Sequence, residues 1–156
     1  MAGQGIHIGI KILGMQKGVA KIQAAKREAR KTRPLFDKAI IVLEQTHAKT
    51  FRMQGRPKWE QSKRAADQGG MTLHDTGRLR GSVTGHSRHA IREVRGNKLL
   101  FGTNLIYAPS HQYGYNPRGI PKRAFLGIYP DDIARLSDIL SQDLDKRITV
   151  VTTVGG

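Results

Sequence analysis

The sequence predicts a single α+β domain over residues 1–156: an antiparallel sheet with a long basic N-terminal helix, broken near Pro34, and a C-terminal helix packed on it. Three patterns predict this class. They are an alternating isoleucine run near the N-terminus, two long segments with apolar residues at helical spacing, and two strand-like runs joined by a turn signal. Extended β arms are expected at the termini, over residues 1–14 and 148–156.

The N-terminal segment "GIHIGIKILG" alternates between apolar and other residues. Its isoleucines, Ile6, Ile8, Ile10 and Ile12, fall on one face of an extended chain, which is typical of a half-buried strand. Its glycines weaken it as a free-standing element. We therefore expect it to pair with another strand, either of its own sheet or at a neighbour's edge.

Two helical segments follow, separated by a proline. Residues 15–32 are predicted to form a strongly basic helix with a narrow apolar stripe. Pro34 predicts a break near Arg33, because proline disfavours helix at the residue before it. A second helix is predicted over residues 34–51. Its core-facing side is formed by residues near helical spacing, namely Phe36, Ile40, Leu43, His47 and Phe51.

The middle of the chain combines an irregular stretch with a short helical turn. Residues 55–75 contain Gly/Pro punctuation around a short basic segment with helical composition. Either Asp75 or Thr76 can cap the helical turn that follows, and Gly77 permits an unusual backbone conformation there.

A hairpin is predicted next. Gly96 and Asn97 lie between two strand-like runs, which is a strong signal for a two-residue turn. The strands are expected near Val83 to Arg95 and Leu99 to Thr103.

The last third is predicted to be loop, short strand, helix and β tail. Residues 107–119 are expected to be mainly loop, with a short strand in the segment that follows. The clearest predicted helix is "PDDIARLSDILSQDLDKRI". Its two aspartates lie at the start, where the helix dipole favours negative charge, and they are expected to form a solvated face. Its apolar face is formed by Ile133, Leu136, Ile139, Leu140 and Leu144. The tail from Ile148 is β-rich in composition.

The net charge of +15 is unevenly distributed along the chain. Residues 1–66 carry fifteen Lys/Arg against four Asp/Glu, a net +11, whereas residues 106–156 carry six against five, a net +1. Such a basic half attracts either nucleic acid or an acidic protein surface. The candidate contacts are Lys17, Lys21, Lys26, Arg27, Arg30, Lys31 and Arg33.

Catalytic and metal-binding chemistry find little support in the residues. The absence of cysteine excludes disulfides and thiolate sites. Ser110 and His111 are neighbours in sequence, and adjacent side chains on a strand point to opposite faces. His86 and His89 have a helical spacing in a strand-like context, so solvated or DNA-facing histidines are expected there instead of metal ligands. A small nuclease or toxin that uses His111 or His86 remains an alternative. No catalytic residue, metal or cofactor is predicted.

The start of the chain has no long apolar stretch, so no signal peptide is expected, and no segment approaches the roughly 20 apolar residues of a membrane span.

Three blocks in series carry a resemblance to a known family. They are Trp59 with the polar basic segment after it, "LHDTGRLRGSV" and "GTNLIYAPSHQYGYNPRGIPKRAFLGI". In this order they resemble the phage virion morphogenesis family, the Mu-like and P2-like group of tail completion and head–tail joining proteins. The residues that match its pattern, as loop-structuring or subunit-interface positions, are Trp59, Thr76, Gly77, Leu79, Arg80, Ser82, Tyr107, Ala108, His111, Gln112, Gly114, Pro121, Arg123, Phe125 and Leu126. Ala124 departs from the pattern, which often has proline there.

The resemblance implies a structural virion protein and not an enzyme. Such a protein completes the tail and joins it to the head at the neck, commonly as a ring of six subunits around the DNA channel. It is made in the host bacterial cytoplasm. The implied partners are further copies of the chain and other neck, portal-side or tail-tube and terminator proteins, with no membrane partner. A non-sequence-specific DNA-binding module that acts through the basic half is the alternative, and it would contact the packaged DNA.

The stretch "YAPSHQYGY" looks at first like an active site, and we interpret it as a structured loop. The hypothesis is that His111 and Gln112 hydrogen-bond backbone groups of this loop or of residues 121–125, which fixes the loop's shape for a neighbour. Gly114 relaxes the backbone for the turn.

Overall fold

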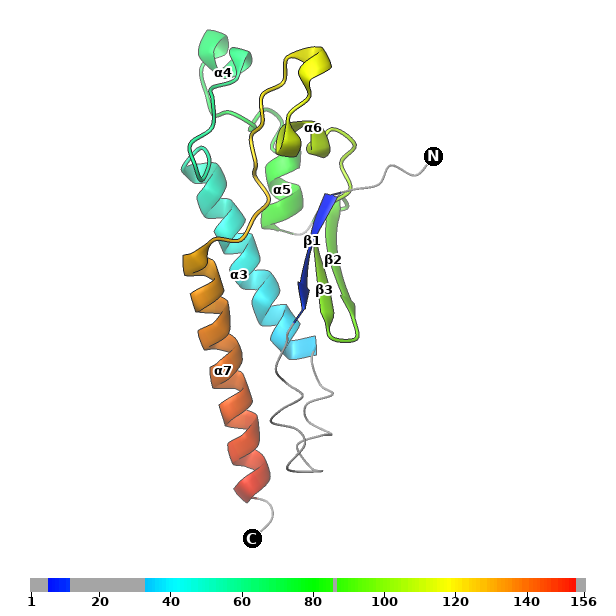
Figure 1. The fold of residues 1–156 in the computed structure, drawn as a ribbon, viewed down its shortest axis with the longest axis vertical. Coiled ribbons are helices and arrows are strands. Elements are labelled where there is room, and N and C mark those ends of the chain that lie inside the picture. Colours follow the sequence, from blue (N-terminus) through cyan, green and yellow to red (C-terminus); the bar gives the residue numbers. More distant parts are fainter. Residues whose placement is uncertain (1–5, 12–32, 86, 154–156) are drawn as a thin grey trace.

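The protein has an α+β fold, which confirms the predicted class. A computed structural model describes residues 6–11, 33–85 and 87–153. The elements in chain order are β1 (Ile6–Lys11), α3 (Arg33–Arg52), α4 (Lys63–Gln68), α5 (Arg78–Thr84), β2 (Ala90–Arg95), β3 (Lys98–Thr103), α6 (Ala108–Tyr113), η1 (Asn116–Arg118) and α7 (Pro130–Thr153). Figure 1 shows an elongated molecule in which α3 and α7 lie side by side. The sheet lies on the side of α3 that faces away from α7.

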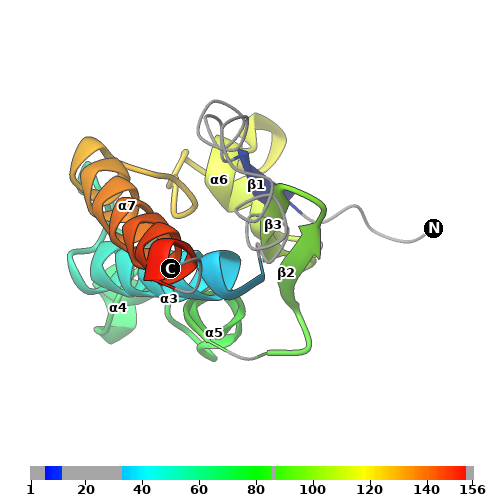
Figure 2. The ribbon, with the colours of Figure 1, turned by 90° about the horizontal axis from the view of Figure 1, so that it is seen from below.

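Helix α3 is the central element of the fold. It packs against α5, α7 and strand β2, and in the end-on view of Figure 2 both α5 and α7 flank it. Its first described residue is Arg33, and Pro34 follows in a position where a helix tolerates proline. The predicted break near Arg33 stays a prediction, because the segment before it lies outside the described residues. The predicted core face is confirmed: Phe36, Leu43, His47 and Phe51 are buried, and Ile40 is half-buried.

The sheet has three antiparallel strands in the order β1-β3-β2. Strand β3 lies in the middle, and its residues Leu99, Phe101 and Thr103 are fully buried. The predicted turn is confirmed, because Gly96 and Asn97 join β2 to β3 and Gly96 has a φ of +60°. The N-terminal strand pairs within its own sheet, where Ile8 lies opposite Phe101 and packs on the core.

The predicted start of the first hairpin strand is wrong. Val83 belongs to helix α5, and β2 begins only at Ala90. Leu79 and Val83 lie four residues apart and are both buried, on a helix that packs against α3. Helical spacing and tertiary burial therefore outweigh the strand preference of the β-branched residue.

The C-terminal helix is longer than predicted. Residues 148–153, expected as a β-rich tail, continue α7 to Thr153. Each residue added to an existing helix makes one more backbone hydrogen bond without a new nucleus, so propagation overrides the local β preference. On the predicted apolar face, Leu136 is buried and Ile139 and Leu140 are half-buried, but Ile133 is 57% exposed.

The segment between β3 and α7 also differs from the prediction. Residues 108–113 form helix α6 where a loop was expected. The predicted short strand does not form there. The structure describes all of residues 121–129, and they form neither helix nor strand. The predicted helix over residues 15–32 lies outside the described residues, as do Ile12 and residues 154–156. Within the described ranges, no helix is long and apolar enough to cross a membrane.

Candidate functional site

Gln112 connects helix α6 to the segment before α7. Its carboxamide oxygen accepts hydrogen bonds from the backbone N–H groups of Phe125 and Leu126, each at 3.0 Å. Its amide nitrogen donates to the carbonyl of Leu126 at 2.8 Å. The predicted hydrogen bonds from the Gln112 side chain to backbone groups are thus present, while its role in shaping the loop for a neighbour stays a prediction.

His111 does not make the predicted side-chain bond at Nδ1, which is buried without a hydrogen-bond partner. The imidazole instead meets the ring of Tyr107 edge-on, with 6.1 Å between the ring centroids. Burial lowers the pKa of His111, and the nearby Arg123 cation lowers it further. The contact that holds the loop is made by the backbone, since the carbonyl of His111 accepts from the N–H of Arg123 at 2.7 Å.

The neighbouring Ser110 lies on the same short helix as His111, where a loop was expected. Adjacent helical positions also do not face each other. The two residues are therefore unsuited to act together on one substrate atom.

Arg123 and Trp59 tie the loop after α3 to the segment before α7. Arg123 is only 6% exposed, and its Nε donates to the carbonyl of Glu60 at 2.7 Å. The indole nitrogen of Trp59 donates to the carbonyl of Ala124 at 3.0 Å, and its ring packs edge-on against Phe51. Like Gln112, both side chains thus hold a distant segment in place by a hydrogen bond to its backbone.

The close approach of the chain to Trp59 requires a glycine. Gly55 has a φ of +107°, and a Cβ at this position would lie 2.5 Å from the carbonyl oxygen of Pro57 and 2.6 Å from the indole. Gly114 serves the same purpose in the later block: its φ is +84°, and a Cβ there would lie 3.1 Å from the backbone nitrogen of Lys122 and 3.2 Å from the carbonyl oxygen of Ile120.

The Thr76–Ser82 block forms the start of helix α5. Gly77 occupies the N-cap position with a φ of +75° and makes no side-chain cap bond, so the predicted cap by Asp75 or Thr76 is wrong. Ser82 is buried and its hydroxyl donates to the carbonyl of Leu79 at 2.7 Å. Thr76 is exposed and Arg80 is half-buried.

The two later motif blocks converge on one cavity. This His111 cavity has a volume of about 320 Å³. It is lined by Leu73, Asp75, Thr76, Gly77, Arg78, Leu79, Tyr107 and His111. Five residues that match the family pattern therefore meet here, from segments before and after the β2–β3 hairpin: Thr76, Gly77, Leu79, Tyr107 and His111.

Large apolar side chains are exposed in the segment that carries Tyr107. We define the α6 patch as Ile106, Tyr107, Tyr113 and Tyr115, which are 81%, 40%, 68% and 44% exposed, respectively. All four fall within ten residues of chain at the end of the molecule where α6 lies (Figure 1). The remaining residues of the block, Ala108, Phe125 and Leu126, are buried, and Pro121 is half-buried. The block therefore has a buried side that packs and an exposed side that is free to contact a partner.

A buried histidine lies in the core between α3 and β3. His47 is stacked on Phe101 at 5.1 Å, and its Nε2 accepts a hydrogen bond from the N–H of Gly127 at 3.3 Å. Its Nδ1 is within bonding distance of the Leu43 carbonyl, which requires the neutral tautomer with the proton on Nδ1. Burial lowers the pKa of His47 to about 4.

The start of α7 holds an ion network that the sequence did not reveal. Asp132 is only 6% exposed and accepts from the Thr46 hydroxyl at 2.9 Å and from Arg56 at 3.2 Å. Arg56 also forms two bonds to Asp131, at 2.7 and 2.9 Å. The predicted solvated aspartate face is therefore wrong for Asp132, while Asp131 is exposed. The missing information was the position of Arg56, which lies 76 residues before Asp132 in the chain.

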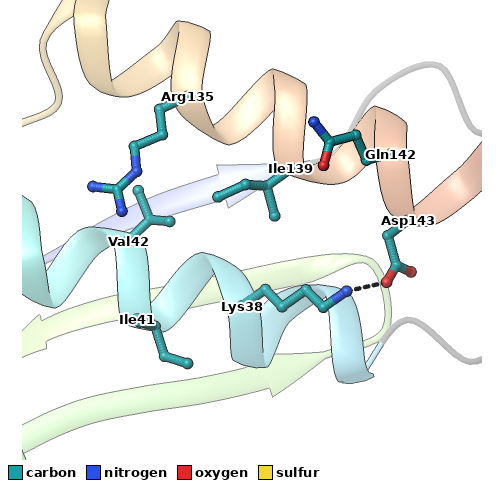
Figure 3. A pocket seen from close by; sticks show the side chains of 7 residues that line it. All are labelled: Lys38, Ile41, Val42, Arg135, Ile139, Gln142 and Asp143. Carbon is teal, nitrogen blue, oxygen red and sulfur yellow. Dashed lines mark hydrogen bonds and ion pairs between the residues drawn. The ribbon is translucent and has the colours of Figure 1, made fainter.

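A groove between α3 and α7 has a volume of about 280 Å³. Figure 3 shows Ile41, Val42 and Ile139 along it, with Lys38 extended toward Asp143, to which it forms an ion pair. The other lining residues are Arg135 and Gln142. The groove is mainly a seam between two packed helices, and none of the family-pattern residues lines it.

The candidate histidine pair and basic contacts are only partly described. His86 lies outside the described residues, and His89 is held by Asn104 at 3.0 Å and by Arg78 at 3.0 Å. Among the residues that the structure describes, no group of three or more His, Asp or Glu is placed to hold a metal ion.

Arg33 is exposed at the start of α3 and pairs with Asp37 at 3.0 Å. The other candidate basic contacts, Lys17, Lys21, Lys26, Arg27, Arg30 and Lys31, lie outside the described residues.

Comparisons with known proteins give two matches. The model of the phage virion morphogenesis family matches residues 13–145. The chain is also 32% identical over 143 residues to the Mu-like prophage FluMu G protein 2 of Haemophilus influenzae, a similarity that covers 88% of this chain and 94% of that protein. No solved structure matches the chain.

Proposed function

Because this chain belongs to the phage virion morphogenesis family, we propose that it completes the phage tail and joins it to the head, as a ring around the DNA channel at the neck. Membership in the family and similarity to a Mu-like prophage protein support a structural role in the phage virion. The position at the neck or tail top and the ring are the specific parts of the proposal.

The observation that carries the proposal is how the motif side chains are used. Gln112, Arg123 and Trp59 all donate to backbone carbonyls of their own chain. These bonds hold the segments around α6, and the α6 patch that these segments carry is exposed. A motif that fixes the shape of an apolar surface suits contact between subunits, whereas a catalytic motif would present polar groups to a substrate. The proposed role requires no catalysis and no cofactor.

A ring needs two different surfaces on each subunit. In a closed heterologous assembly, a patch on one copy meets another surface on the next copy. We assign the α6 patch to one of these surfaces, because large side chains such as tyrosine and isoleucine contribute binding free energy when they are buried at an interface. The ring is expected to have six subunits, with other neck, portal-side or tail-tube and terminator proteins above and below it.

Native mass spectrometry of the purified protein tests the ring. The unchanged protein is expected to show a closed oligomer, with six copies as the leading expectation. The double variant Ile106→Ser, Tyr113→Ser is expected to show monomers with little change in melting temperature, because both side chains are already exposed.

The matched control is Ile133→Ser, which removes an exposed isoleucine of α7 that is 57% accessible. This variant is expected to keep the oligomer. A monomeric unchanged protein argues against the ring, and a double variant that still assembles argues against the α6 patch. Deletion of the gene from an inducible phage is expected to give unjoined heads and tails by electron microscopy, and joined particles would refute the joining role.

A second candidate function is non-sequence-specific DNA binding, which is favoured by the net charge of +11 over residues 1–66. It predicts micromolar or tighter binding that weakens steeply with salt. A gel shift at physiological salt is the direct test. If no complex forms there, the basic half is assigned to an acidic protein partner in the assembly.

A further inference from the structure

Strand β1 covers the edge of the central strand of the sheet. It pairs with β3 from Ile6 opposite Thr103 to Lys11 opposite Lys98, and in the sheet it pairs with no other strand. Without it, β3 would have an unpaired edge beside fully buried side chains such as Phe101. Buried backbone N–H and C=O groups need partners, so some strand must occupy this edge.

β1 is separated from the rest of its own domain along the chain. The family match begins at residue 13, after β1 has ended. Residues 12–32, twenty-one in number, lie between β1 and α3. A chain of this length can span up to about 70 Å when extended. By contrast, β2 and β3 are joined by a turn of two residues, Gly96 and Asn97, which forces them to pair within one chain.

We propose that β1 of one copy pairs with β3 of the neighbouring copy in the assembled ring. This inference rests on the proposed ring and deepens it, because it names the second surface of each subunit: the edge of β3 that β1 covers. The exchanged strand makes the same backbone bonds in the same register as the strand within one chain. In a ring the neighbour's β3 edge is held nearby at high effective concentration, so exchange requires only a connection long enough to reach it.

The charge of the protein favours this kind of attachment. Each copy carries a net charge of +15, so neighbouring copies repel each other over about a Debye length. A contact that relies on ion pairs between identical basic subunits is poorly suited to overcome that repulsion. Backbone hydrogen bonds along a strand, together with the burial of Ile8 on the core of the next copy, do not depend on charge.

Disulfide trapping between two distinguishable copies tests the exchange. The chain contains no cysteine, so any introduced pair is unique. Gly9 lies opposite Leu100 in the β1–β3 register, it is exposed, and a Cβ there would meet nothing within 4 Å. The opposed Cα atoms of antiparallel strands are about 4.5 or 5.5 Å apart, and both spacings suit a disulfide. Gly9→Cys is placed on one tagged chain and Leu100→Cys on a second chain with another tag. The two chains are produced together and oxidised mildly.

The control uses the same Leu100→Cys chain with a partner on the other side of β3. Glu93 lies opposite Leu100 in the β2–β3 register and is exposed. The hairpin turn prevents exchange of β2, so a Glu93→Cys chain is expected to form no disulfide with the Leu100→Cys chain. Placed together in one chain, Glu93→Cys and Leu100→Cys are expected to form an internal disulfide, which shows that Leu100→Cys is reactive.

The proposal expects a disulfide-linked heterodimer from the Gly9→Cys and Leu100→Cys chains and none from the Glu93→Cys control. A single chain with both Gly9→Cys and Leu100→Cys is expected to give a covalent ladder on a non-reducing gel. If that double variant forms only an internal disulfide, or none at all, the exchange is refuted. Native mass spectrometry of the same samples distinguishes a failure of the strand exchange from a failure of the ring. A ring with internal disulfides keeps the proposed function and rejects the exchange, whereas a monomer rejects the ring itself.

Discussion

Replacing Gln112 with alanine removes three hydrogen bonds between α6 and the segment before α7. The backbone N–H groups of Phe125 and Leu126 lose their acceptor, and the Leu126 carbonyl loses a donor. Phe125 is 1% and Leu126 6% exposed, so water replaces these partners poorly. A buried polar group left without a partner costs about 1–3 kcal/mol.

With two donors orphaned and Gln112 itself half-buried, we expect Gln112→Ala to lower the free energy of unfolding by about 3 kcal/mol. For a chain of this size the melting temperature is then expected to fall by about 6–12 °C. Urea denaturation followed by circular dichroism measures the difference. The same change at Gln142, an exposed residue of α7, is the control, and it is expected to shift the free energy by less than about 0.5 kcal/mol.

The reasoning is refuted if Gln112→Ala and Gln142→Ala destabilise the protein equally. The oligomer provides a second measurement. Because the bonds of Gln112 hold the loop that carries Tyr113, Gln112→Ala is also expected to weaken assembly at temperatures where the monomer remains folded. Normal assembly of a destabilised variant would show that the loop keeps its shape without these bonds.

Two further predictions concern the core. His47 has a pKa of about 4 in the folded protein, below its unfolded value near 6.5, so its contribution to stability is full above pH 6.5 and is lost as the pH falls toward 4. Between pH 7 and pH 5 this loss amounts to about 2 kcal/mol, and His47→Gln, which does not titrate, is expected to reduce the pH dependence of urea unfolding by that amount; an unchanged dependence would contradict the burial of a neutral imidazole. Gly55→Ala places a Cβ 2.5 Å from the Pro57 carbonyl at a φ of +107°, so it is expected to destabilise by about 1–3 kcal/mol or more. Gly85→Ala, which has a φ of −175° and open space around it, is expected to be tolerated in the same melting experiment, and equal effects of the two changes would argue against the close approach to Trp59.

Local patterns predicted the elements whose cause is local. The spacing of Phe36, Leu43 and His47 indicated which face of α3 is buried, because helical periodicity places such residues on one side. Gly96 and Asn97 indicated the hairpin, because a two-residue turn needs residues that tolerate a positive φ.

The errors lie where distant parts of the chain outweigh local preference. Val83 has the β-branched side chain of a strand residue, but it is buried on a helix against α3. Asp132 looked like a solvated helix start, yet Arg56 and Thr46 surround it from far earlier in the sequence. No local signal identifies such partners, because their approach depends on how α3 and α7 pack.

The sequence by itself determined the family, the fold class and the residues of the three motif blocks, since these depend on residue order and spacing. Only the tertiary structure decided what each of those residues does. Gln112 bonds to the backbone at Leu126 while the adjacent Tyr113 is exposed to solvent, and His111 lines a cavity with Nδ1 unpaired. The physical reason is that burial and hydrogen bonding are properties of pairs of segments. Residues 111–113 acquire their roles only when residues 123–126 are packed against them.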